Sequence, residues 1–192
     1  MFEKAFPGET EPVTAENWGK AIGAYERTLL TPAAFDRYLK GDKAALNTQA
    51  KQGLDKFMNY GCSGCHNGVT VGGQMYQKFG LTQDYWVLTG SQEIDLFKDR
   101  DKGRIRDTKN EADAFIFKVQ QLRNVAMTPP YFHDGSVAEL GDAVRIMAKL
   151  QLGRDLTDAD VSDLIAFLQS LTGDVPAQFA AAPSLPAAAY QY

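Results

Sequence analysis

The chain has 192 residues and a mass of 21.1 kDa, a size that suits one domain with a full core and extended arms. Hydrophobic residues make up 44% of it and charged residues 23%, values that are ordinary for a globular protein. The net charge of −4, without a cluster of basic residues, argues against a nucleic acid partner, and no apolar run is long enough for a membrane span.

Two short helices are predicted at the start of the chain. Thr14 is a suitable N-cap, and the apolar residues after it recur every three or four positions, which would place them on one side of a helix. These residues are Trp18, Ile22, Tyr25 and Leu29. Thr31 followed by Pro32 predicts the start of a second helix, which Gly41 would end.

The next segment predicts a third helix that leads into a cysteine motif. Asn47 would cap this helix, and Leu54, Phe57 and Met58 would form its apolar side. The motif is Cys62-Ser63-Gly64-Cys65-His66, which contains the only two cysteines and one of the two histidines in the chain. C-x-x-C-H is the spacing that attaches a c-type haem.

The chemistry of haem attachment explains this spacing. Two thiols three positions apart on one turn can add to the two vinyl groups of one haem, and the next residue then carries its imidazole under the iron. We therefore predict one covalent haem c, with Cys62 and Cys65 as thioether anchors and His66 as the proximal iron ligand.

Three other interpretations of the motif are weaker. A thioredoxin-like redox pair is expected in a βαβ setting, whereas the flanks of this motif predict helix. A zinc site needs two more ligands at short spacing, and His133, far along the chain, does not supply them. A disulfide within the motif would be strained and would constrain the unfolded chain very little.

The second half of the chain begins irregularly and ends in helices. Glycines interrupt every periodic stretch between residues 67 and 115, and residues 98–106 form a charge run typical of a solvated loop. Ser136 and Glu139 have the spacing of a capping box that would open one helix, and Thr157 would open the last, with Gly173 just past its end. The Ala- and Pro-rich tail predicts no regular structure. We expect an all-α fold, a cytochrome c-type haem domain with long irregular loops.

Spacing leaves the sixth iron ligand open. Met58 lies one helical turn before the motif and Met75 soon after it, so neither would easily reach the opposite face of the haem. Met127, in a Pro-rich loop, and Met147, on the helix after the capping box, are both candidates, although methionine often serves only to fill a core. His133 is a third candidate, although a histidine in a turn beside Asp and Gly is more often hydrogen-bonded locally.

Several longer stretches of the chain are informative together. They are residues 2–7 (FEKAFP), 24–29 (AYERTL), 71–74 (VGGQ), 122–125 (LRNV), 128–135 (TPPYFHDG), 143–147 (AVRIM), 151–153 (QLG) and 166–168 (AFL). In these stretches the sequence resembles the bacterial dihaem cytochrome c peroxidases, and the resemblance covers nearly the whole chain.

The resemblance implies that the chain corresponds to the second half of such an enzyme, the cytochrome c domain that carries the high-potential haem. It implies Met147 as the distal iron ligand and Met127 as a core residue. It also implies a calcium ion held partly by the backbone carbonyls of Thr128 and Pro130, since carbonyl oxygens suit a hard cation. The implied organisation is a helical segment from the domain crossover at residues 1–45, the cytochrome c domain at 46–173 and an extended tail at 174–192.

Electron transfer within a peroxidase is the function that the resemblance implies. A small donor, a cytochrome c or a cupredoxin, would reduce this haem, and the electron would pass to a peroxidatic haem on the missing N-terminal domain, where hydrogen peroxide becomes water. The alternative is a stand-alone monohaem cytochrome that carries electrons without catalysis. A third hypothesis is that Met147 leaves the iron and this haem itself meets peroxide.

The expected surroundings of the protein follow from the same motif. Haem attachment by thioethers normally occurs after export, so we expect a periplasmic protein. Residues 1–4 are not a signal peptide, and the chain is therefore expected to start at a processed terminus or to be a fragment. The resemblance also implies a homodimer.

Overall fold

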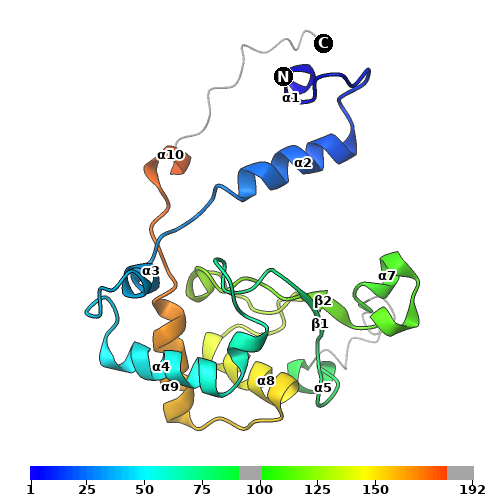
Figure 1. Ribbon diagram of the computed structural model, residues 1–192. Coiled ribbons are helices and arrows are strands. Elements are labelled where there is room, and N and C mark those ends of the chain that lie inside the picture. Colours follow the sequence, from blue (N-terminus) through cyan, green and yellow to red (C-terminus); the bar gives the residue numbers. More distant parts are fainter. Residues whose placement is uncertain (91–100, 181–192) are drawn as a thin grey trace. The chain divides into compact units, whose positions relative to one another are not determined.

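The computed structural model describes residues 1–90 and 101–180 (Figure 1). The chain forms two compact units, one of residues Pro32–Gly173 and a smaller one of Met1–Thr31 with the residues from Asp174 onward. The larger unit begins at Pro32 rather than at residue 46, because helix α3 (Ala34–Leu39) packs with the residues that follow it. Phe35 of α3 lies against the main core and its ring meets that of Phe167 edge-on at 5.3 Å.

Three longer helices build the larger unit: α4 (Thr48–Asn59), α8 (Leu140–Leu152) and α9 (Asp158–Gln169). The predicted caps of α4 and α9 are confirmed. The Asn47 side chain accepts a hydrogen bond from the backbone N–H of Ala50 at 2.7 Å, and Thr157 forms a capping box with Asp160. These contacts satisfy backbone donors that a helix leaves unpaired at its first turn.

The predicted capping box at the start of α8 is wrong. The helix begins at Leu140, Glu139 is its N-cap, and no side chain caps it. The residues before it are extended because Tyr131 donates its backbone N–H to the carbonyl of Val137 at 2.6 Å, and the two residues form an isolated antiparallel bridge. This backbone pairing outweighs the capping preference of Ser136.

The core of the larger unit lies where α4 crosses α9 (Figure 1). Gly53 makes the crossing close, because a Cβ at this position would overlap the carbonyl oxygen of Asp163 and lie 2.9 Å from the Cβ of Phe167. The phenyl rings of Phe57 and Phe167 pack 5.0 Å apart beside it. The buried members of this cluster are Phe57, Val71, Leu164, Phe167, Leu168 and Leu171.

The described residues between 67 and 115 are more ordered than predicted, and the fold is helix-rich rather than all-α. Strands β1 (Tyr76–Lys78) and β2 (Ile116–Lys118) pair antiparallel, with Gln77 opposite Phe117. Short helices lie between them and after them: α5 (Trp86–Thr89), α7 (Ile105–Thr108), and the 3₁₀ turns η3 (Glu111–Asp113) and η4 (Val125–Met127). The first part of the predicted charge run, residues 98–100, lies outside the described residues.

The smaller unit contains α1 (Phe2–Ala5), α2 (Ala15–Glu26) and α10 (Ala177–Ala180). Thr14 caps α2 as predicted, accepting from the N–H of Asn17 at 3.1 Å. Its apolar side is not buried, since Trp18 keeps 62% and Tyr25 54% of its surface exposed. The tail was expected to lack regular structure, and α10 corrects this for four of its residues. Within the described part of the chain, no helix has the length and apolar character to cross a membrane.

The close crossing predicts that Gly53→Ala destabilises the larger unit by about 1–3 kcal/mol, because the added methyl group meets a backbone carbonyl that cannot move alone. Urea unfolding of the two proteins measures this difference.

Gly141→Ala is the matched control, a helical glycine in the same unit whose added Cβ would lie 3.5 Å from the nearest side-chain atom. It is expected to be neutral or to stabilise by up to about 1 kcal/mol. Equal stability of wild type and Gly53→Ala would show that the crossing is looser than described.

Candidate functional site

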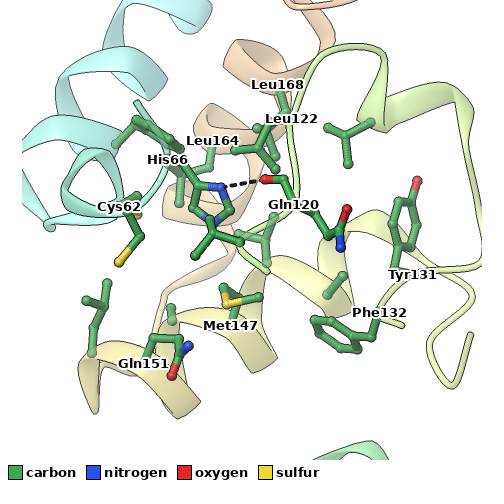
Figure 2. A pocket seen from close by; sticks show the side chains of 18 of the residues that line it. Cys62, His66, Gln120, Leu122, Tyr131, Phe132, Met147, Gln151, Leu164 and Leu168 are labelled. Atoms are coloured by element: carbon green, nitrogen blue, oxygen red, sulfur yellow. Dashed lines mark hydrogen bonds between the residues drawn. The ribbon is translucent and has the colours of Figure 1, made fainter. Parts of the chain in front are cut away.

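An apolar cavity of about 310 Å³ lies in the larger unit between α4, α8, α9 and the segment around β2. Its volume falls in the range of small-molecule and cofactor sites. The predicted haem-binding residues all line it (Figure 2): Cys62, Cys65, His66 and Met147. The rest of the lining is largely aliphatic and aromatic, so a bound planar group would be shielded from water.

The cysteine motif forms a tight turn directly after α4. Gly61 has a φ of 98°, a left-handed conformation that suits glycine and turns the chain away from the helix axis. Cys62 then begins the 3₁₀ turn η1 (Cys62–Gly64), and the N–H of His66 closes back on the Cys62 carbonyl at 2.9 Å. Both cysteines are free, and burial raises the pKa of the Cys62 thiol. Both sulfurs therefore lie on one turn beside the cavity.

The tautomer of His66 is determined by its partner. Its Nδ1 lies 3.2 Å from the backbone carbonyl oxygen of Gln120. A carbonyl oxygen can only accept, so the ring proton is on Nδ1 and the lone pair is on Nε2. Burial lowers the pKa of His66, which favours the neutral ring. A neutral imidazole with one nitrogen bonded to a carbonyl is the usual arrangement of a metal-binding histidine.

The methionines separate clearly in the structure. Met147 comes from α8, and Figure 2 shows its sulfur on the wall of the same cavity that His66 lines. Met127 is 68% exposed at the end of η4, so its expected role as a core residue is wrong. Met58 is half-exposed on the outer side of α4 and does not line the cavity.

His133 also lines the cavity. Its contacts could not be predicted from the sequence. Its Nε2 lies 2.6 Å from Oδ2 of Asp101, and its ring stacks on Phe117 with the centroids 4.3 Å apart. Asp101 sits in the charge run, where nothing in the local pattern distinguishes it from its neighbours.

The two residues implied for calcium lie on the surface. Thr128 and Pro130 are both exposed in the segment before Tyr131. In the described part of the chain, no group of three or more His, Cys, Asp or Glu side chains is placed to hold a metal ion. Calcium at the backbone carbonyls of these residues stays a prediction.

Arg123 makes structural contacts that the sequence did not predict. Its guanidinium makes a two-pronged ion pair with the Asp36 carboxylate at 2.7 and 2.8 Å. Its Nε donates to the carbonyl of Val69 at 2.7 Å, in the loop just after the cysteine motif. Arg123 therefore links the loop that follows His66 to helix α3.

Comparison with known proteins identifies relatives of the chain. The family model described as di-haem cytochrome c peroxidase matches residues 1–44. Cytochrome c551 peroxidase of Pseudomonas aeruginosa is 49% identical over 176 residues, which cover 91% of this chain and 49% of the relative. The chain belongs to the dihaem cytochrome c peroxidase family. Cytochrome c peroxidase Ccp of Escherichia coli is 42% identical over 161 residues, which cover 83% of this chain and 33% of that protein.

A solved structure of a family relative has a similar fold. It is the crystal structure of a MauG-like protein associated with microbial copper homeostasis, with a TM-score of 0.66 and 26% identity. The match covers 90% of this chain and 57% of that one. The chain spans about half the length of the curated peroxidase from Pseudomonas aeruginosa.

The ion pair between Arg123 and Asp36 predicts a contribution to folding stability that is lost in acid. Partial burial acts to raise the pKa of Asp36, but hydrogen bonds from Arg123 and from the Ala33 N–H lower it overall. A carboxyl group with a lowered folded-state pKa stabilises the fold above its unfolded pKa of about 3.9, and this is lost as the pH falls through the folded value. At pH 7, Asp36→Asn should cost about 1–3 kcal/mol.

Urea unfolding at pH 7 and in steps below pH 4 measures this difference. The gap between wild type and Asp36→Asn should narrow as the pH falls. Asp42→Asn, an exposed carboxyl that makes a local turn contact with the Ala44 N–H, is the control and should show a much smaller gap. A gap for Asp36→Asn that is constant with pH would contradict the ion pair.

Proposed function

We propose that this chain is the electron-transfer half of a cytochrome c peroxidase and holds one covalent haem c. The observation that carries the proposal is the shared cavity: both cysteines, His66 and Met147 line one apolar space of cofactor size. The haem, when bound, supplies a one-electron Fe(III)/Fe(II) couple.

Each residue has a defined task in this proposal. Cys62 and Cys65 form the thioether bonds, so the group cannot dissociate. His66 binds the iron through Nε2 while Gln120 keeps its Nδ1 proton in place. Met147 would supply a thioether as the second iron ligand, and His/Met ligation would raise the reduction potential, which suits an electron acceptor. The apolar lining excludes water, so little solvent reorganisation accompanies electron transfer.

The partners and location follow from the peroxidase family. We infer that a small redox protein, a cytochrome c or a cupredoxin, donates the electron, and that a peroxidatic haem on a separate N-terminal domain receives it and reduces hydrogen peroxide. Attachment of haem through thioethers implies the periplasm. The same proposal includes a homodimer and a calcium ion at Thr128 and Pro130. The calcium ion would be bound by backbone carbonyl oxygens.

The ligand assignment predicts a change of spectrum on replacing one methionine. The protein is produced together with a bacterial system that attaches haem to C-x-x-C-H motifs. Wild type is expected to carry one covalent haem with a low-spin, six-coordinate spectrum. Met147→Ala should convert the ferric form to a high-spin or water-ligated spectrum, because the sixth ligand is lost.

Met127→Ala is the matched control, since Met127 is exposed and does not line the cavity. Its spectrum should equal that of wild type. An unchanged spectrum in Met147→Ala would remove Met147 from the iron, and a wild type without covalent haem would overturn the proposed function itself.

If peroxide is reduced at a haem on a separate domain, this chain alone should not turn over hydrogen peroxide. Reduced cytochrome c should give one electron per haem in a single rapid phase, after which added hydrogen peroxide should cause no sustained oxidation. Optical stopped-flow followed by a steady-state assay measures both steps. Sustained turnover would contradict a fixed Met147 and favour direct reaction of this haem with peroxide.

A separate observation distinguishes the peroxidase half from a stand-alone cytochrome. The gene sequence upstream of Met1 is expected to encode a second C-x-x-C-H motif. A signal peptide directly before Phe2 would instead support the stand-alone carrier.

A further inference from the structure

The two ends of the haem cavity differ in chemistry. Figure 2 shows Cys62 at one end, with Tyr131 and Phe132 at the other. The lining also includes His133, which follows Phe132 directly in the chain, and Lys118, which is the one lining residue with a permanent charge among those described. Because His133 follows Phe132 directly, its imidazole belongs to the end of the cavity opposite Cys62.

A c-type haem has matching polarity. Its two vinyl groups are on one edge of the porphyrin, and its two propionate carboxylates are on the opposite edge. If the vinyl edge were bonded to Cys62 and Cys65, the carboxylates would lie towards the opposite end of the cavity, which contains Tyr131, Phe132 and the adjacent His133. Carboxylates in an apolar site need hydrogen-bond donors or positive charge, because burying them unpaired is costly.

His133 is held for such a contact by three kinds of interaction. Its ring stacks on Phe117 at 4.3 Å with an interplanar angle of 28°, and the rings of Tyr85 and Phe79 meet it edge-on at 5.5 and 5.9 Å. Its Nε2 lies 2.6 Å from Oδ2 of Asp101. The imidazole plane and one nitrogen are therefore fixed, although a quarter of the side chain stays exposed.

Asp101 is itself anchored by a second donor. The hydroxyl of Tyr85 donates to the same Oδ2. Burial first, and the neighbouring Asp101 carboxylate second, raise the pKa of Tyr85, so the phenol keeps its proton and remains a donor. A carboxylate oxygen accepts from both partners, which places a proton on Nε2 of His133 and leaves Nδ1 for another group.

We propose that the chain Tyr85–Asp101–His133 is a recognition element for a haem propionate, in which Nδ1 of His133 donates to the carboxylate while Nε2 donates to Asp101. An imidazole that donates from both nitrogens carries a positive charge. Positive charge on His133 and Lys118 offsets the negative charge of the propionate and of Asp101. This disfavours the oxidised iron relative to the reduced iron and therefore raises the reduction potential. His133 is a positioning residue, and the inference rests on the proposed haem site.

The first test is the reduction potential of the haem-loaded protein, measured by optical redox titration. His133→Phe keeps an aromatic ring in the stack but removes both donors, and His133→Gln keeps polarity without charge. Both variants should have a lower potential than wild type, as should Lys118→Gln. Lys43→Gln is the control, since Lys43 lies over the Tyr38 ring, does not line the cavity and should leave the potential unchanged.

The second test does not need a variant. In the reduced, haem-loaded protein with ¹⁵N-labelled histidine, NMR at neutral pH should show protons on both ring nitrogens of His133. A single ring proton, or a wild-type potential in both His133 variants with normal covalent haem, would overturn the inference and leave the proposed function intact. Absence of covalent haem from wild type would instead overturn the proposed function.

Discussion

The close crossing of α4 and α9 is the contact on which the rest of the larger unit depends. It exists because Gly53 has no side chain, so the backbone of α9 around Asp163 can approach α4 directly. The approach brings Phe57 and Phe167 into ring contact and turns Leu164 and Leu168 of α9 towards the cavity. Since α4 ends just before Cys62, its position also sets where the thiols lie. Packing in the core thereby places the cofactor chemistry.

The two histidines of the chain show how a partner determines the chemistry of the same side chain. His66 meets a neutral carbonyl, which fixes one proton and leaves a lone pair for a metal. His133 meets the carboxylate of Asp101, which can only accept a hydrogen bond and therefore places the donor at Nε2 of the ring. One imidazole is thus suited to bind iron, and the other is suited to interact with the charged edge of the same cofactor. Both partners come from segments distant in the sequence.

Local signals predicted the helices well where the relevant interactions are local. Asn47 and Thr157 cap the helices that they were expected to cap, because a cap involves atoms within three residues. The same reasoning failed at Ser136, where pairing of Tyr131 with Val137 keeps the chain extended. It also missed β1 and β2, since three-residue strands have too little periodicity to detect and depend on each other for pairing. The apolar side of α2 followed its predicted spacing, but spacing does not show whether such a side is buried.

The sequence by itself determined the cofactor chemistry, because the residues of the C-x-x-C-H motif are contiguous and their spacing along the chain fixes how they lie in space. Resemblance of longer stretches indicated the family and singled out Met147. Only the tertiary structure brought Met147 into the cavity lined by His66, exposed Met127 on the surface, and joined Tyr85 and Asp101 to His133. These contacts link residues that are far apart in the chain, and their formation depends on how the helices and loops pack, which no local pattern of residues encodes.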